Sequence, residues 1–139
     1  MLVVLVNGLP GSAKTTVARA LGRVLGLPVF CKDGLKETLA DMLEKPAGRA
    51  GLAKAGIELN GAGSARVREV WCHVPSGLAR SRYEARVRHT IHGDADVGDA
   101  RWREWAAGAE PLALGPVYWL DTSKSVDISG LAQLCEAPQ

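Results

Sequence analysis

Apolar residues near the N-terminus change from a strand-like to a helix-like spacing. Residues 2–6 are all apolar and mostly β-branched, which is typical of a short strand covered on both faces of a parallel sheet. Over residues 14–25, apolar side chains recur every three or four positions and arginines occupy the other face. Gly26 and Pro28 then supply stop signals. The pattern predicts a buried strand, a glycine loop and a helix of about three turns.

The next segment is predicted to continue a parallel α/β unit. Residues 28–31 are typical of a second short strand, and Asp33 is placed to cap a helix over residues 34–44. Residues 46–65 are rich in glycine and alanine without a clear period, which predicts a linker with at most a weak helical turn. The order of strand, loop, helix, strand and helix indicates an α/β fold with a mostly parallel sheet.

The second half of the chain alternates in the same way. Residues 66–74 are predicted to form a strand, and Ser76 to cap a helix that reaches about residue 88. Residues 88–100 are polar and contain glycine, as a lid-like loop would. The remaining predictions are a short helix over 101–107, a strand over 116–120 and a closing helix over 128–135. With 139 residues, the chain is expected to form a single domain, 1–139.

Composition narrows the class of protein. The apolar share of 47% and the charged share of 23% are ordinary for a soluble protein, and no apolar run approaches the roughly 18 residues of a membrane span. The formal net charge is only +2, which is too mild to predict an obligate nucleic-acid partner. Three cysteines without paired spacing indicate reduced thiols rather than a disulfide framework. We expect a cytoplasmic protein that is monomeric or weakly oligomeric and has no membrane partner.

A phosphate-binding motif occupies the loop between the first strand and the first helix. It reads Gly8-Leu9-Pro10-Gly11-Ser12-Ala13-Lys14-Thr15, which matches the P-loop (Walker A) pattern G-x-x-x-x-G-K-[ST] with alanine in place of the second glycine. The backbone amides of this loop, through Thr16, are expected to surround the β-phosphate of ATP at the positive end of the helix. The Lys14 ammonium would bridge the β- and γ-phosphates, and the Thr15 hydroxyl would bind Mg²⁺.

Ala13 leaves one question open within this motif. Its methyl group is harmless if the backbone φ angle is negative, and strained if the site needs a left-handed residue. The alternative to a nucleotide site is a glycine-rich turn that carries a lysine by accident. A buried strand before the loop and a helix after it argue against that alternative.

Three segments resemble the small P-loop kinases. This group contains polynucleotide kinases, chloramphenicol phosphotransferases and zeta-toxin-like proteins, and is often classed among AAA family ATPases. The segments are residues 5–16, residues 31–37 with the sequence CKDGLKE, and residues 82–92 with the sequence RYEARVRHTIH. The resemblance implies a three-layer P-loop NTPase fold with parallel strands in the order 2-3-1-4-5. It also implies transfer of the γ-phosphoryl group of ATP to a hydroxyl.

The same resemblance assigns roles outside the phosphate loop. Asp33 would contact the acceptor hydroxyl and take its proton, although an aspartate before a helix can also be only an N-cap. Arg82 and Arg86 are four apart on the predicted helix and would face the phosphates from a lid. The alternative for the arginines is a solvated helix on which Glu84 pairs with Arg88.

The chain departs from the resembling kinases between its second and third predicted strands. Residues 46–65 are too few for the family's third strand with its flanking helices. We therefore predict four strands, with residues 116–120 two places from the first strand. Asp121 and Thr122, which follow that strand, would border the adenine.

Three functional hypotheses remain. The first is an ATP-dependent phosphotransferase that uses ATP and Mg²⁺ on a small hydroxyl-bearing acceptor. The second is a nucleotide-binding protein with reduced or no catalysis, and the third, a nucleic-acid end-processing kinase, is disfavoured by the modest charge. A zinc site built on His89 and His92 would lack a second paired cluster. Trp102 and Trp105 are interpreted as packing residues.

Overall fold

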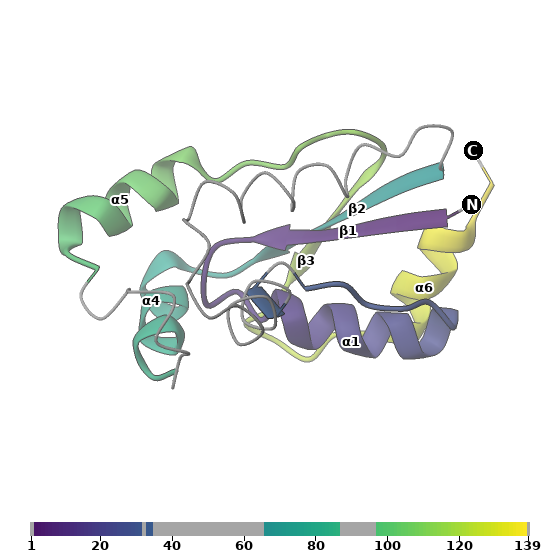
Figure 1. Ribbon diagram of the computed structural model, residues 1–139, viewed down its shortest axis with the longest axis horizontal. Helices are drawn as coiled ribbons and strands as arrows, with labels where there is room; N and C mark the ends of the chain where they lie inside the picture. The colour runs from purple at the N-terminus through teal and green to yellow at the C-terminus, as the bar shows by residue number, and fades with distance from the viewer. Residues whose placement is uncertain (1, 32, 35–65, 87–96, 139) are drawn as a thin grey trace, which may run out of the picture.

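The computed structural model describes residues 2–31, 33–34, 66–86 and 97–138. Within them, strands β1 (Leu2–Gly8), β2 (Arg66–His73) and β3 (Val117–Asp121) form one parallel sheet in the order β1-β2-β3. Helices α1 (Lys14–Leu25) and α6 (Ile128–Glu136) lie side by side on one face of this sheet (Figure 1). The predicted α/β class and the parallel sheet are confirmed.

The main core lies between the sheet and these two helices. The parallel register pairs Val6 with Val70 and Val70 with Tyr118, so alternate residues of the three strands face the same helices. Val17 and Leu21 of α1 pack against them because residues four apart share one face of a helix. The other buried members of this core are Cys72, Leu131, Ala132 and Cys135.

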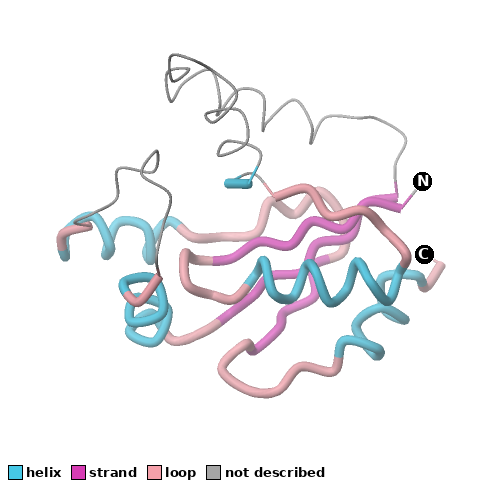
Figure 2. Tube along the Cα trace, turned by 60° about the horizontal axis from the view of Figure 1, so that its bottom comes forward, coloured by secondary structure: helices cyan, strands magenta, loops and turns pink. Residues whose placement is uncertain are grey.

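The opposite face of the sheet is crossed by the connection from α5 (Asp99–Gly108) to β3 (Figures 1 and 2). This connection approaches β2 closely, since a Cβ on Gly115 would lie 2.3 Å from the Val67 carbonyl oxygen. Glu69 and Trp71 of β2 face the connection because they alternate with the core residues of that strand. In the described part of the chain, helices therefore cover one face of the sheet, and the three-layer arrangement stays a prediction.

Helices α4 (Ser76–Glu84) and α5 lie beyond the carboxyl ends of the strands (Figure 1). They share a second core cluster, in which the Tyr83 and Trp102 rings are 5.7 Å apart between centroids. Leu9 of the loop after β1 and Trp105 pack against this cluster. The interpretation of Trp102 and Trp105 as packing residues is confirmed, and the cluster fixes both helices beside the glycine loop.

The predicted second strand is wrong. After α1, the Leu27 amide donates to the Gly22 carbonyl (2.9 Å) and turns the chain, and Val29 packs beside Gly22. Residues 28–31 then run along α1 without joining the sheet, and Phe30 is left 83% exposed. Pro28 also lacks the N–H that a strand ladder needs. The described sheet has three strands instead of four, while the place of β3 two positions from β1 is confirmed.

Two helix starts also differ from the predictions. Ser76 is the first residue of α4 and not its cap, because Pro75 is the N-cap and no side chain caps the helix. Asp33 is itself in helical conformation. The linker over 46–65, nearly all of the helix over 34–44 and most of the lid over 88–100 lie outside the described residues.

Candidate phosphate-binding site

The loop between β1 and α1 has the backbone of an anion cradle. Gly8, Gly11 and Ala13 all have positive φ angles, of 147°, 85° and 60°. Ala13 is the N-cap of α1 and no side chain caps the helix, so the first intrahelical bond runs from the Val17 amide to the Ala13 carbonyl (3.1 Å). The amides from Ala13 to Thr16 therefore have no acceptor inside the helix. Amides in this position, at the positive end of a helix, are suited to bind phosphate.

Close packing explains both glycines. A Cβ on Gly8 would lie 2.4 Å from the Cys72 carbonyl oxygen at the end of β2, and one on Gly11 would lie 1.9 Å from the Ala79 carbonyl oxygen of α4. The loop is thus held between β2 and α4. Ala13 has the left-handed conformation, which costs an L-residue free energy, so this position of the motif is strained.

Ser12 connects the loop to the end of β3. Its side chain is fully buried, and its Oγ has no hydrogen-bond partner. Its carbonyl oxygen lies 3.0 Å from the hydroxyl of Thr122, a buried residue whose amide donates to the His73 carbonyl (2.9 Å). Thr122 therefore supports the loop from behind. A buried hydroxyl left without a partner is what a loop awaiting a bound anion would show.

Lys14 is the main cationic group of the loop. Its Nζ donates to the Leu9 carbonyl oxygen (3.1 Å), which holds the ammonium over the loop. Burial lowers the pKa of Lys14 from its usual 10.5, and the positive charge of Arg86 lowers it further, while Asp33 opposes these effects. Asp33 and Arg86 are therefore near enough to influence the charge of Lys14, while their catalytic roles stay a prediction.

Arg82 and Arg86 do not share a helix face. α4 ends at Glu84, so Arg86 follows the helix, and its amide bonds the Tyr83 carbonyl (3.3 Å). Arg82 donates from Nη1 to the Thr122 carbonyl oxygen (3.2 Å), and thus ties α4 to the turn after β3. The spacing argument was wrong because it assumed a helix reaching residue 88. Glu84 pairs with Arg80 (2.7 Å), and Arg88, its partner in the alternative interpretation, lies outside the described residues.

The Asp121 carboxylate is engaged in its own turn. It accepts hydrogen bonds from the amide and hydroxyl of Ser123, and Lys124 lies 3.3 Å from it. These contacts lower the pKa of Asp121 to about 2, with the Ser123 hydrogen bonds as the largest cause. The predicted adenine contact of Asp121 stays a prediction.

Sequence reasoning missed Glu69. This fully buried carboxylate accepts hydrogen bonds from Asn7 Nδ2 (2.9 Å), the Leu112 amide (2.9 Å) and the Ala113 amide (2.8 Å). It joins the residue before Gly8 to the connection that crosses the sheet. A carboxylate directly before the apolar run Val70-Trp71-Cys72 of a predicted strand was the available signal, because such a group is buried only when its oxygens are satisfied.

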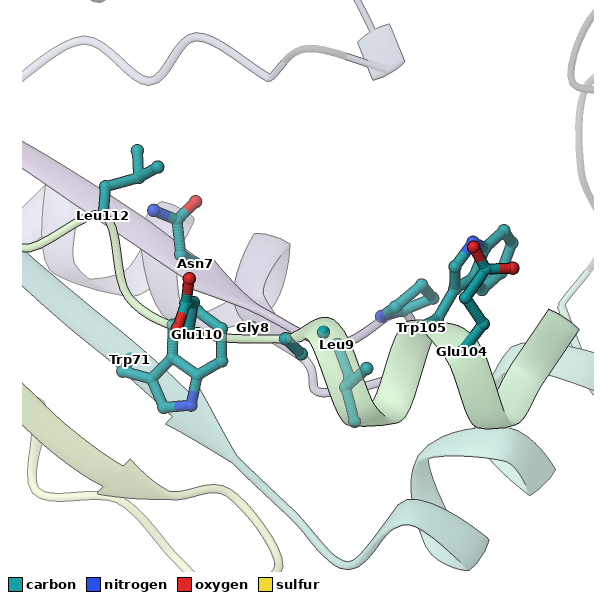
Figure 3. Close-up of a pocket in the computed structure, with 11 residues that line it drawn as sticks. Asn7, Gly8, Leu9, Trp71, Glu104, Trp105, Glu110 and Leu112 are labelled. Atoms are coloured by element: carbon teal, nitrogen blue, oxygen red, sulfur yellow. The ribbon is translucent and has the colours of Figure 1, made fainter.

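An open groove of about 590 Å³ borders the loop on this second side of the sheet. It reaches from the first residues of the loop to α5 and the start of the connection to β3 (Figure 3). Its lining includes two indole rings, Trp71 and Trp105, and two carboxylates, Glu104 and Glu110. The groove could not be read from the sequence, since its walls come from three separate segments.

Comparisons with known proteins bear on this geometry. No protein-family model matches the chain. A cytidylate kinase from Pyrobaculum aerophilum is 62% identical over 29 residues, and the match spans 21% of this chain and only 16% of that enzyme. The crystal structure of a putative kinase from Chloroflexus aurantiacus is similar with a TM-score of 0.73, at 20% identity, over 94% of each chain. The chain shares its fold with this structure, and the particular group of kinases that the resemblance implied stays a prediction.

Two kinds of feature are absent from the described residues. No helix there is long and apolar enough to cross a membrane. No group of three or more His, Cys, Asp or Glu side chains gathers there in a way that could hold a metal ion.

Proposed function

We propose that this chain binds ATP at the β1–α1 loop and transfers its γ-phosphoryl group to a hydroxyl of a small acceptor. The observation that carries the proposal is the loop itself, with its free amides from Ala13 to Thr16, the buried unpartnered hydroxyl of Ser12 and the ammonium of Lys14. The fold shared with a kinase-like structure supports the same conclusion.

The electrostatics of the loop fit a polyphosphate. Burial makes the charged form of Lys14 costly, and Arg86 adds like charge beside it. Bound phosphate oxygens would relieve both effects, so part of the binding free energy comes from removing an unfavourable interaction already present. Mg²⁺ would take the Thr15 hydroxyl as its protein ligand and fill its other positions with phosphate oxygens and water. The ion would neutralise charge on the transferred group.

Asp33 and Arg86 are the residues we assign to the chemistry. Asp33 is close enough to influence the charge of Lys14, and its carboxylate would accept the proton of the attacking hydroxyl. The guanidinium of Arg86 would stabilise the charge that spreads over the γ-phosphoryl oxygens. Arg82 already donates a hydrogen bond to the Thr122 carbonyl oxygen, and it would act by holding α4 against the turn after β3.

A second candidate is a nucleotide-binding protein with reduced or no catalysis. Residues 46–65 favour it in one respect, because they are too few for the family's third strand, which in the resembling kinases helps to supply the metal and acceptor contacts. A nucleic-acid end-processing kinase is the least supported, since the net charge is only +2.

Calorimetric titration with ATP and Mg²⁺ tests the proposal. Lys14→Ala should weaken binding by about 10- to 100-fold, the range expected for hydrogen bonds to a charged partner. Arg19→Ala, on the exposed side of the same helix, is the matched control and should bind as the parent does. Unchanged binding by a folded Lys14→Ala variant would show that the phosphate site is misassigned.

Turnover separates the two candidate functions. Asp33→Asn and Arg86→Ala should lower phosphoryl transfer much more than they lower ATP affinity, because their assigned roles lie in the transition state. If the parent binds ATP and releases no ADP with any hydroxyl acceptor, the binding-only function is correct. If Asp33→Asn mainly lowers the melting temperature, Asp33 is a structural residue.

A further inference from the structure

Strand β3 leaves one edge of the sheet open. Within the described residues it pairs only with β2, as the last strand in the order β1-β2-β3. The Glu69 amide donates to the Pro116 carbonyl (2.9 Å), so the even-numbered residues of this segment direct their backbone groups toward β2. Because that direction alternates along a strand, Val117, Trp119 and Asp121 present their N–H and C=O groups at the open edge.

The open edge lacks the features that usually protect one. Exposed edges are commonly blocked by lysine, by proline or by a bulge. β3 has the sequence VYWLD and an unbroken register with β2, so it contains none of the three. An edge of this kind is a template for pairing with another chain.

Apolar side chains lie on both sides of this edge. On the sheet face opposite the helices, Trp119 is 65% exposed, and its ring meets the Trp71 ring edge-on with 6.0 Å between centroids. On the helix side, Leu134 of α6 is exposed, and its carbonyl accepts a hydrogen bond from the Tyr118 hydroxyl (2.9 Å). Tryptophan and tyrosine with few charges around them are typical of the centre of a protein interface.

The charges near this edge favour a second copy of the chain over a charged partner. β3 and α6 carry one charged residue each, Asp121 and Glu136, and each is the last residue of its element. The Asp121 carboxylate is already bonded to Ser123 and lies 3.3 Å from Lys124. If two copies pair antiparallel, their Asp121 residues lie about 13 Å apart along the strands, where the repulsion between them is mostly screened.

We propose that β3 pairs with β3 of a second copy, antiparallel across a two-fold axis, so that the two sheets become one. The pairing is self-complementary, since each outward N–H or C=O group meets its counterpart on the other copy. With the axis at Trp119, the middle residue of β3, the two Trp119 side chains form a directly opposed pair on one face. The inference does not depend on the proposed function, because the phosphate loop follows β1 at the other side of the sheet.

The pairing should be weak. A buried tryptophan side chain covers about 150–250 Å², so two that are each 65% exposed could lose roughly 200–300 Å² between them. Even with the strand backbones and Leu134 added, the interface stays near the lower end of specific complexes, about 1,200 Å². We therefore expect a reversible dimer that is populated at about 100 µM and dissociated at about 1 µM.

Sedimentation velocity over a range of concentrations tests the proposal. The weight-average mass of the parent should rise from that of a monomer toward twice that value. Trp119→Lys sets two like charges directly opposite each other and should raise the dissociation constant at least about tenfold. Phe30→Lys is the matched control, because Phe30 is an exposed aromatic residue (83%) outside the sheet, and it should dimerise as the parent does. A parent that stays monomeric at about 500 µM would overturn the inference, as would unchanged dimerisation of Trp119→Lys.

A proline variant tests the backbone bonds and keeps Trp119. The Val117 N–H points away from β2, so Val117→Pro removes a bond of the dimer and none of the sheet. By symmetry two hydrogen bonds are lost, which should weaken dimerisation by about tenfold. Circular dichroism confirms that each variant is folded. A folded Val117→Pro variant that associates like the parent would rule out pairing through this edge.

A cysteine variant tests the position of the axis. In the hydrogen-bonded antiparallel pair expected at Trp119, the two Cα atoms are about 5.5 Å apart, which a disulfide can span. With the half-exposed Cys31 replaced by serine, Trp119→Cys should therefore crosslink two copies under mild oxidation. Leu114→Cys, at an exposed position of the connection before β3, should not. Crosslinking through Leu114→Cys alone would indicate face-to-face packing and overturn the edge assignment.

Discussion

Replacing Ala13 with glycine should stabilise this protein, although glycine in the interior of a helix does the reverse. Ala13 has φ 60° and ψ 16°, in the left-handed region. For an L-residue this conformation costs about 1–2 kcal/mol, and glycine adopts it freely. The substitution Ala13→Gly would remove that cost and restore the usual glycine of the phosphate motif.

The gain is reduced by the unfolded state. Glycine loses more backbone entropy on folding than alanine, a difference of about 0.5–1 kcal/mol. The net increase in the free energy of unfolding should therefore be about 0.5–1 kcal/mol. For a domain of this length, that corresponds to a rise in melting temperature of about 2–4 °C.

The control is Ala20→Gly in the same helix. Ala20 lies in the interior of α1, where glycine has only its entropic cost, so its unfolding free energy should fall by about 1 kcal/mol. Both variants are compared with the parent by thermal and urea unfolding followed by circular dichroism. The opposite signs are the test. If Ala13→Gly lowers the melting temperature as Ala20→Gly does, Ala13 is not left-handed and the loop conformation described above is wrong.

Three further outcomes are expected. Glu69→Ala removes the acceptor of three amides and should lower the free energy of unfolding by about 3 kcal/mol in urea titrations; a loss below about 1 kcal/mol would contradict its role. Because burial and then Arg86 lower the pKa of Lys14, ATP affinity measured by calorimetry should fall as the pH rises through that lowered value. Arg86→Ala should move this fall in affinity to higher pH. A fall at the same pH as in the parent would show that Arg86 does not act on Lys14. Burial raises the pKa of Cys72 to about 11, so iodoacetamide at pH 8 should label the half-exposed Cys31 first, and equal labelling rates in peptide mass spectra would argue against the packing of β2.

Local patterns were sufficient to predict the elements that pack on the main core. The bounds of α1 were predicted from helical spacing and from the glycine that ends it, β1 and β3 from apolar runs, and β2 from alternation. These segments are informative because burial of one face imposes a period on the sequence. The strand predicted at 28–31 failed because an apolar run can equally lie along a helix, as Val29 does beside Gly22.

The phosphate loop was predictable, but its supports were not. The motif from Gly8 to Thr15 lies in consecutive residues, so it can be recognised without a fold, and its role in phosphate binding stays a prediction. The bonds of Arg82 and Glu69 join residues 40 or more positions apart, and no local pattern encodes them. Arg86 was wrongly predicted to lie on the helix because α4 ends at Glu84. Residue spacing determines helix ends poorly, since the last turn frays.

The supports of the phosphate loop also bear on the order in which the protein can assemble during synthesis. The loop is finished within the first 16 residues, but its conformation depends on partners made much later. Asn7 is bonded to a residue 62 positions downstream, and the Ser12 carbonyl to one 110 positions downstream. Such long-range closures are slow to form and are made late in folding. A nascent chain that has emerged only through α1 would therefore carry every phosphate ligand of the motif and still lack a rigid cradle. Nucleotide bound at the proposed site could therefore help to complete folding only once β3 and its turn have left the ribosome.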